Sequence, residues 1–252
     1  MEEFDEEDPP IYCIMVTGKS KCRTDLAQKS LDNFLEQSYQ NKKLIVINHG
    51  KEKIIKDPMT NVFEHQIEKT ESTTLGDIRN ISLNLVPINA CWITWDDDDY
   101  RSPQYLSYLF SIMKSSRCDV VALTERYEYN YNTGLVWKMS FKNGFVHILA
   151  KQDLRIRYQS KDSMEDINLI NDFRKLGKKV HVVERNDPSL YIRVVHTDNT
   201  SEYVNKNKTN VRDIDPRTSM YLENKVDEQK AKEIRDFMYD YYKTGLQCML
   251  NS

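Results

Sequence analysis

The sequence contains little glycine, no closely paired cysteines and no long apolar run, and each absence argues against a class of protein. Only 7 of the 252 residues are glycine, and the loop TGKSKCR after the first apolar run has one, which argues against a glycine-rich phosphate loop. The 5 cysteines are scattered and form no C-x-x-C pair, so neither a disulfide framework nor a zinc knuckle is expected, and a reducing compartment is favoured. No stretch approaches the roughly 18 apolar residues that a membrane-spanning helix needs.

The charge is nearly balanced, with 36 Lys and Arg residues against 39 Asp and Glu residues and a formal net charge of −3 at pH 7. Such a balance creates no general attraction to nucleic acid, so no nucleic-acid partner is expected. The segment MEEFDEEDPP, residues 1–10, lacks the basic and apolar regions of a signal peptide and is predicted to be a disordered acidic tail. We therefore expect a soluble cytoplasmic protein without a transmembrane segment.

The hydrophobic pattern of the first half predicts alternating strands and helices. Strands are expected at 11–16, 43–47, near 61–65, at 90–95 and at 118–123. Helices are expected at about 24–39, 74–86 and 102–113. The run at 90–95 is apolar throughout, which is typical of a central strand in a parallel sheet. The predicted fold is α/β, with a Rossmann-like, mostly parallel central sheet flanked by helices.

The pattern changes beyond residue 125. Hairpin-like alternation, with turns at 132–134 and 143–144, precedes an amphipathic helix and a further strand. A last, charged helix is expected at 225–244, with an apolar face of Ile234, Phe237, Met238 and Tyr241. This helix would form a C-terminal extension that packs either on its own domain or on a partner, so the sequence leaves the oligomeric state open.

Four carboxylates, Asp96–Asp99, stand in a row directly after the predicted central strand. In open α/β sheets, ligands bind at the carboxyl ends of the strands. In an extended segment alternate residues point to the same side, so Asp96 and Asp98 are expected to face one ligand. Carboxylate oxygens suit Mg²⁺ or Mn²⁺, which bridge to substrate phosphates. The alternative is a solvated acidic turn that caps the helix beginning at Ser102; the apolar run before the acids favours a metal–diphosphate site.

Four segments, in the same order, resemble inverting glycosyltransferases of the GT-A fold, most closely family 2. Residues 13–50 are similar to the opening strand, loop and helix of that family, including the run FLEQSYQNKKLIV. The other segments are TLGDIRNISLNL, WDDDDYRSPQYL with a D-x-D motif, and MEDINLINDFRKLGKKV. A tail at 191–201, YIRVVHTDNTS, resembles a pattern seen in part of the family. One such segment would be weak, but four in order over roughly residues 11–201 are specific.

The resemblance implies a metal-dependent enzyme that moves a sugar from a nucleotide-sugar, with a UDP-sugar favoured, to a hydroxyl of a glycan or other glycoconjugate acceptor. The cofactor would be Mn²⁺ or Mg²⁺. A GT-A domain would span 11–205, with a nucleotide-sugar-binding half at 11–123 and an acceptor half at 124–205. Residues 206–252 would form the helical extension.

The resemblance also assigns roles to residues. Asp166 matches the general base that deprotonates the acceptor hydroxyl; the alternative makes it a first-turn acid of a helix, together with Glu165. Asp98 and His196 match the metal ligands, although a lone histidine is more often structural. Donor contacts are implied for Thr17, Asn48, His49, Arg79, Asp96 and Asp97, of which Asp97 is the position expected to tolerate substitution best.

Some positions depart from the family pattern or have a second interpretation. Asn48–His49 stands where the family commonly has Asp-Asp or Asn-Asp, which leaves the base preference open. This departure also favours an alternative function, an inactive GT-A-like protein that binds nucleotide-sugars. A nucleotidyltransferase is a further alternative, disfavoured by the missing glycine-rich loop. Arg79 would otherwise be an exposed residue paired with Asp77 or Glu71, and Trp137 is either an acceptor platform or a core residue.

Overall fold

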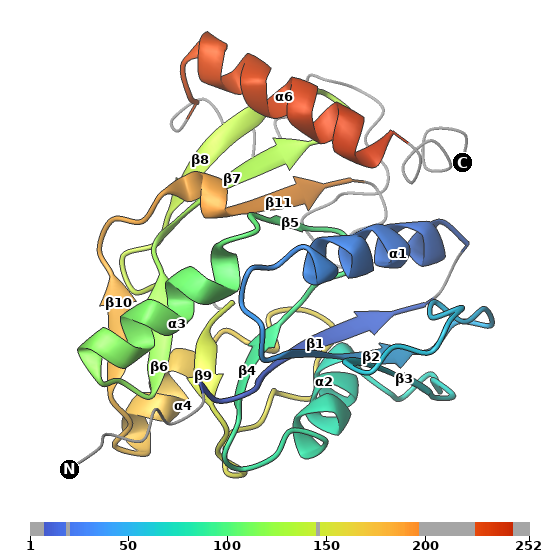
Figure 1. Ribbon diagram of the computed structural model, residues 1–252, viewed down its shortest axis with the longest axis vertical. Helices are drawn as coiled ribbons and strands as arrows, with labels where there is room; N and C mark the ends of the chain where they lie inside the picture. Colours follow the sequence, from blue (N-terminus) through green and yellow to red (C-terminus); the bar gives the residue numbers. More distant parts are fainter. Residues whose placement is uncertain (1–7, 19–20, 145–146, 197–224, 244–252) are drawn as a thin grey trace.

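The computed structural model describes residues 8–18, 21–144, 147–196 and 225–243, which form two sheets with their covering helices (Figure 1). The larger sheet has seven strands in the spatial order β10 (Val180–Val183), β6 (Val120–Leu123), β9 (Leu149–Lys151), β4 (Cys91–Thr94), β1 (Ile11–Thr17), β2 (Lys42–Asn48) and β3 (Val62–Gln66). All neighbours are parallel except β9, which is antiparallel to both β4 and β6. The predicted mostly parallel central sheet is therefore confirmed.

Helices cover both faces of the seven-stranded sheet, because the strand side chains that point to either face are apolar. Ile11 and Met15 of β1 pack in one cluster with α1 (Lys21–Leu35) and α3 (Tyr105–Ser116). Tyr12 and Ile14 face the other way and pack in a second cluster with α2 (Leu75–Asn84) and α4 (Leu169–Lys175). A strand buried on both faces explains the continuous apolar runs of the sequence.

The smaller sheet has four strands in the order β5 (Tyr100–Arg101), β11 (Tyr191–Val195), β7 (Glu125–Asn130) and β8 (Val136–Ser140). The short helix η1 (Pro188–Leu190) leads into β11. The expected hairpin turn at 132–134 joins β7 to β8, and Gly134 takes a positive φ of 68° there. The second expected turn, at 143–144, joins no hairpin, because the next strand, β9, belongs to the larger sheet.

Helix α6 (Glu228–Tyr242) covers the smaller sheet with a face that shares Ile234 and Met238 with the expected one. Its buried residues are Ala231, Ile234, Met238 and Tyr242, which recur at three and four positions. Phe237 is 44% exposed, so the predicted stripe was rotated by part of a turn. Phe237 instead lies at the edge of the packing, with its ring 4.8 Å from that of Tyr100.

Two helix starts also differ from the expected ones. Helix α1 begins at Lys21, which draws the end of the TGKSKCR loop into the helix. Helix α3 begins at Tyr105 because the Ser102 amide still donates to Leu190 O at 3.0 Å, continuing the pairing of β5 with β11. The consequence for the site is that Arg23 lies in a helical turn, where the sequence predicted a loop.

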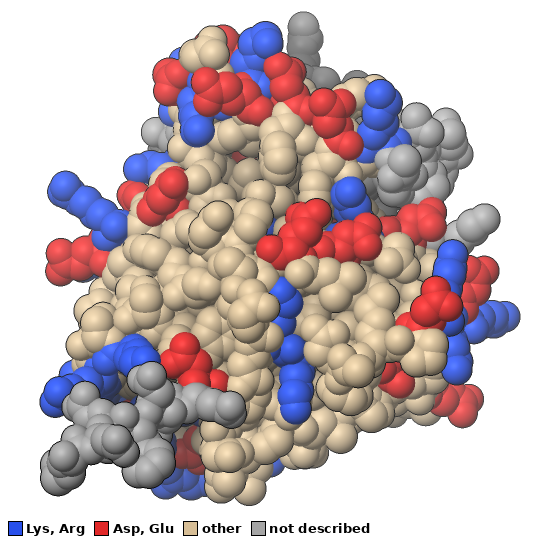
Figure 2. All heavy atoms as spheres, in the orientation of Figure 1, with Lys and Arg blue, Asp and Glu red and all other residues tan. Residues whose placement is uncertain are grey.

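The surface seen in Figure 2 mixes both signs of charge, and acidic side chains gather over α1 and α6. Cys13, Cys91 and Cys118 are free thiols and are buried. No helix within the described ranges combines the length and the apolar character that crossing a membrane would require.

Candidate functional site

The four aspartates lie in the connection between β4 and β5, at the carboxyl end of the larger sheet. The neighbouring parallel strands β1 and β2 end at the same edge, at Thr17 and Asn48. The loops after β1 and β2 nearly touch: a Cβ on Gly18 would lie 2.6 Å from the Gly50 amide nitrogen, and the φ of Gly18 is +135°. A glycine is therefore required at position 18 for the two loops to approach.

The acidic segment is not extended, and its side chains do not alternate as expected. A turn at Asp97–Asp98 breaks the strand geometry. Asp96 accepts from Arg79 at 2.8 Å and lies 3.1 Å from His147 Nε2, whereas Asp98 faces Arg23 and His196, at 2.8 and 3.1 Å. The expectation that Asp96 and Asp98 face one ligand is therefore wrong for this structure, because period two holds only while the backbone stays extended.

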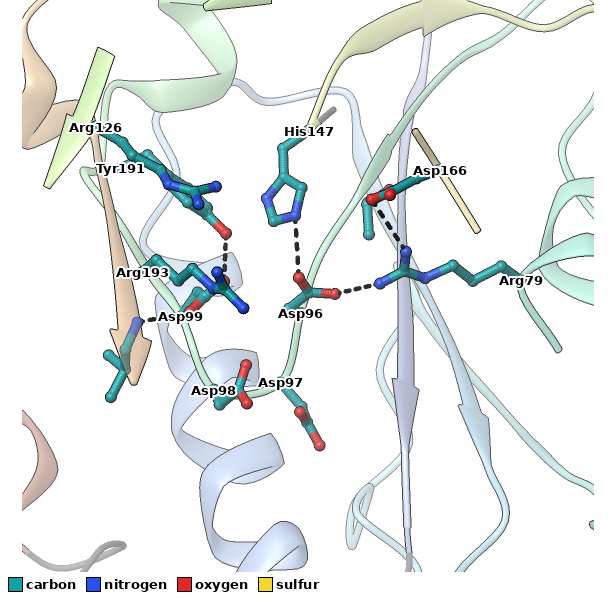
Figure 3. A network of polar contacts seen from close by, with 12 residues as sticks. Arg79, Asp96, Asp97, Asp98, Asp99, Arg126, His147, Asp166, Tyr191 and Arg193 are labelled. Carbon is teal, nitrogen blue, oxygen red and sulfur yellow. Dashed lines mark hydrogen bonds and ion pairs between the residues drawn. The ribbon is translucent and has the colours of Figure 1, made fainter. Parts of the chain in front are cut away.

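Asp99 points to the same side as Asp96 (Figure 3). One carboxylate oxygen of Asp99 accepts from the Tyr191 hydroxyl, and the other accepts from the Val194 amide at 2.9 Å. One ligand atom from each of Asp96, Asp99 and His147 lies within 4.8 Å of the others. Two carboxylate oxygens and one imidazole nitrogen form a donor set that could hold a divalent metal ion.

Burial and charge push the four carboxyl pKa values apart. Burial opposes ionisation, but Arg79 and His147 hold the pKa of Asp96 well below its usual value. Arg23 and His196 likewise lower the pKa of Asp98 against the effect of burial. Burial raises the pKa of Asp97 to about 6, although Arg23 opposes this, and burial beside Asp98 raises that of Asp99 to about 7. The cluster therefore carries less negative charge at neutral pH than four independent aspartates would.

His147 was not among the residues that the sequence singled out. It follows the 125–144 segment in no recognisable spacing motif, and it reaches the aspartates because β9 inserts between β4 and β6. Burial lowers the pKa of His147, which favours the neutral imidazole that binds metals. To identify His147, one would need to know that β9 inserts as an antiparallel strand between β4 and β6. Sequence periodicity does not reveal such an insertion.

Arg79 links the acidic segment to the predicted base. Its guanidinium contacts Asp96, forms an ion pair with Glu165, and lies 3.7 Å from Asp166 Oδ2. Arg79 is buried, so the alternative of an exposed arginine paired with Asp77 is wrong; Asp77 instead completes a capping box with Thr74. Burial raises the pKa of Glu165 despite the attraction of Arg79.

The segment that carries Asp166 is docked on the start of α2. The Gly76 amide donates to Lys161 O at 3.0 Å, and the Leu75 amide donates to Asp162 at 3.1 Å. A Cβ on Gly76 would lie 1.8 Å from Gln159 O, so this contact requires glycine. Asp166 lies in a turn before α4, which begins at Leu169, so it is not a first-turn acid of that helix.

Thr17, Asn48 and His49, three of the residues expected to contact the nucleotide, lie where β1 and β2 end, at the carboxyl end of the larger sheet. Thr17 is buried, and the His49 amide donates to Thr17 O at 3.0 Å. The amide nitrogen of Asn48 donates to Glu64 Oε1 and to Glu52 O, each at 2.7 Å, and its oxygen accepts from Gly50 at 2.7 Å. Both ends of the Asn48 side chain thus shape the loop after β2.

The aromatic and arginine residues on the acceptor side differ in exposure. Trp137 is 3% exposed and so belongs to the interior, in line with the core interpretation. Arg193, 25% exposed, points toward the aspartates (Figure 3) and pairs with Glu128 at 3.7 Å. His196 is fully buried against Asp98, and the rest of the 191–201 tail lies outside the described residues.

The sequence matches no protein-family model and no curated protein. The structure is similar to that of S. aureus TarS 1–349, with a TM-score of 0.55 and 16% identity over 73% of this chain, which spans 60% of that chain. It is also similar to TarS 1–349 in complex with UDP-GlcNAc, with a TM-score of 0.56 and 13% identity over 94% of this chain and 74% of that one. The mannosyltransferase PcManGT from Pyrobaculum calidifontis, in complex with GDP-Man and Mn²⁺, has a TM-score of 0.54 and 12% identity over 75% of this chain and 57% of its own. The chain therefore has the fold of GT-A glycosyltransferases.

Proposed function

We propose that the protein is a metal-dependent glycosyltransferase that moves a sugar from a nucleotide-sugar, with a UDP-sugar favoured, to an acceptor hydroxyl on a glycan or glycoconjugate. The observation that carries the proposal is the Asp96–Asp99–His147 group at the carboxyl end of the central sheet. Proteins of similar structure form complexes with UDP-GlcNAc or with GDP-Man and Mn²⁺. The similar fold, together with a group of side chains that could hold a metal ion, supports the same class of ligand here.

The divalent ion would be held by Asp96, Asp99 and His147. When bound, such an ion neutralises the negative charge that develops on a departing diphosphate. Asp98 and His196, which the resemblance implies as ligands, lie 3.1 Å apart and are the alternative site for the ion. We assign the ion to Asp96, Asp99 and His147 because one ligand atom from each of them lies within 4.8 Å of the others.

Asp166 is the proposed general base for an inverting transfer. Its carboxylate is 19% exposed, so an acceptor hydroxyl can reach it from solvent. The base would take the proton of that hydroxyl as the oxygen attacks the anomeric carbon on the face opposite the leaving diphosphate. Arg79 pairs with Glu165 in the same turn and also contacts Asp96, and the backbone before the turn packs closely against Gly76.

The test is the melting temperature of the protein with UDP- and GDP-sugars, each with and without Mn²⁺. A donor at about 100 times its dissociation constant stabilises the native state by about 2.7 kcal/mol, which a thermal shift resolves easily. We expect a shift that needs both donor and Mn²⁺, and that is lost in His147→Ala but kept in His65→Ala, an exposed histidine on β3.

Turnover then separates the functions. Release of free sugar or of a glycosylated acceptor supports the proposal if NMR shows that its anomeric configuration is inverted relative to the donor. Binding without turnover across an acceptor panel would favour the inactive nucleotide-sugar-binding protein. Pyrophosphate release from a nucleoside triphosphate would favour a nucleotidyltransferase, and no binding of any nucleotide-sugar would contradict the proposal altogether.

A further inference from the structure

One end of the larger sheet carries a surface that the proposed function does not use. The segments before β4, β6 and β10 meet there with the segment after β9, which is antiparallel to its neighbours. This end is opposite the one that carries the Asp96–Asp99 run. The four segments, which we call the basal surface, are residues 81–90, 114–119, 151–157 and 172–179.

Contacts between the four segments make them one continuous surface. The Gln152 amide donates to Ala90 O at 2.9 Å, so the segment after β9 lies against the turn between α2 and β4 (Figure 1). Lys178 pairs with Asp153 at 3.1 Å, which joins the segment after β9 to the segment before β10. The segments before β6 and β10 are adjacent because these two strands are parallel neighbours.

The basal surface is basic although the chain as a whole has a formal net charge of −3. It contains nine Lys and Arg residues against three Asp residues and no Glu. Each of these aspartates already pairs with a cation of the surface, and the neighbouring Asp8 pairs with Lys114. Within the part of the chain that the structure describes, four exposed cationic side chains of the surface pair with no carboxylate: Arg117, Arg157, Arg174 and Lys179.

Apolar side chains protrude from the same surface. Ile88 is 71% exposed in the turn between α2 and β4, and Leu154 is 52% exposed in the segment that lies against this turn. Ile81 and Leu85, one helical turn apart at the end of α2, are exposed as well. Protruding apolar side chains among cations without acidic partners are typical of proteins that lie on anionic membranes.

We propose that the basal surface attaches the protein peripherally to a membrane that contains anionic lipids. The cations face the lipid headgroups, while Ile88 and Leu154 enter the boundary between headgroups and acyl chains. A nucleic acid would meet the same cations with its phosphates, but it offers no apolar layer to these two side chains. Because the Asp96–Asp99 run lies at the other end of the strands, attachment leaves the candidate site open to solvent.

The test is sedimentation of the full chain with vesicles of phosphatidylcholine alone and of phosphatidylcholine mixed with phosphatidylserine. We expect binding to the mixed vesicles only, and weaker binding as salt is added, because salt screens the attraction. The triple variant Arg117→Gln, Arg174→Gln, Lys179→Gln should bind at least about tenfold more weakly, since each cation near an anionic membrane strengthens binding about fivefold.

A second triple variant controls for the loss of net charge. Lys51→Gln, Lys53→Gln, Lys56→Gln removes three exposed cations from the loop after β2, outside the basal surface. This variant should bind the mixed vesicles as the wild type does. Circular dichroism checks that each variant is folded, and all six substituted side chains are exposed.

The apolar side chains are tested separately from the charges. Ile88→Asn combined with Leu154→Asn keeps every charge and should weaken binding to the mixed vesicles severalfold. Leu35→Asn combined with Tyr239→Asn, at exposed positions on α1 and α6, should leave binding unchanged.

Two results would overturn the proposal. One is no sedimentation with the mixed vesicles, and the other is a loss in the control variants as large as in the basal-surface variants. Binding of single-stranded RNA that the triple variant weakens and the apolar variant does not, without vesicle binding, would assign the surface to nucleic acid instead. Donor binding and turnover enter none of these measurements, so this inference and the proposed function stand or fall independently.

Discussion

The two sheets of the molecule meet at the acidic segment and contribute to it in different ways. The seven-stranded sheet is covered by helices on both faces, and its strand ends carry the Asp96–Asp99 run. The four-stranded sheet and α6 supply hydrogen bonds to that run: Tyr191 and the Val194 amide hold Asp99, and the Tyr242 hydroxyl donates to Asp98 O at 2.8 Å. The larger sheet thus presents the chemical groups, while the smaller sheet and its helix orient them.

This division predicts that substitutions on the larger-sheet side affect turnover more than stability. The largest effect is expected for Asp166→Asn, which keeps the shape of the side chain and removes its basicity. Loss of a general base lowers kcat by about 100- to 10,000-fold, while the dissociation constant of the donor should stay unchanged. Steady-state kinetics with the donor and acceptor found by screening, together with donor calorimetry, measure both quantities.

Asp162→Asn is the matched control for this variant. Asp162 belongs to the same docked segment but is 69% exposed and contacts Lys69 and the start of α2. Near wild-type turnover in Asp166→Asn, or an equal loss in both variants, would contradict the assignment of the base.

The converse prediction concerns the helix that covers the smaller sheet. Met238 is fully buried between α6 and that sheet, so Met238→Ala should lower the free energy of unfolding by about 2–5 kcal/mol. Phe237→Ala, at a position that is 44% exposed, should cost clearly less although it deletes more atoms. Urea denaturation of both variants tests the observed helix face; a larger loss for Phe237→Ala would favour the face expected from the sequence.

A smaller loss of stability is expected for a substitution where the two sheets join. Tyr191→Phe removes the hydroxyl that donates to Asp99 and leaves a buried carboxyl oxygen without that donor. The expected loss of stability is about 1–3 kcal/mol. Tyr12→Phe on β1 makes the same chemical change away from the acidic segment and should be nearly neutral. Equal denaturation midpoints for the two variants would show that the Asp99 contact contributes nothing.

The smallest expected effect is a pH dependence of the stability that comes from Glu165, on the side of the larger sheet. Burial raises the pKa of Glu165 above its ordinary 4.5. The native carboxyl therefore keeps its proton at pH values where the unfolded chain has lost it. The stabilisation this provides is complete below 4.5 and is lost as the pH rises through the native pKa. The stability of the wild type relative to Glu165→Gln should fall as the pH rises above 4.5 in urea titrations at several pH values; a rise would show that Arg79 outweighs burial.

Local patterns predicted the elements that carry the site. The strand at 90–95, the helix at 74–86 and the hairpin turn at 132–134 all appear near their expected positions, because each depends on periodicity or turn chemistry within a few residues. The buried face of α6 was predicted only in part: Ile234 and Met238 are buried as expected, but Phe237 is not, because the sheet beneath decides which apolar side chains of a helix are buried. His147 was missed because its position depends on which strands β9 pairs with.

The sequence by itself determined that the chain is an α/β protein and that four carboxylates follow its central strand, because both depend on residue types and their spacing. The tertiary structure alone decided which way each carboxylate points. A turn imposes no fixed period on its side chains, so Asp96 and Asp99 face His147 and Tyr191, and Asp97 and Asp98 face Arg23, according to what distant elements place beside them. Partners for buried charges come from contacts between elements, and those contacts exist only once the two sheets and their helices have packed.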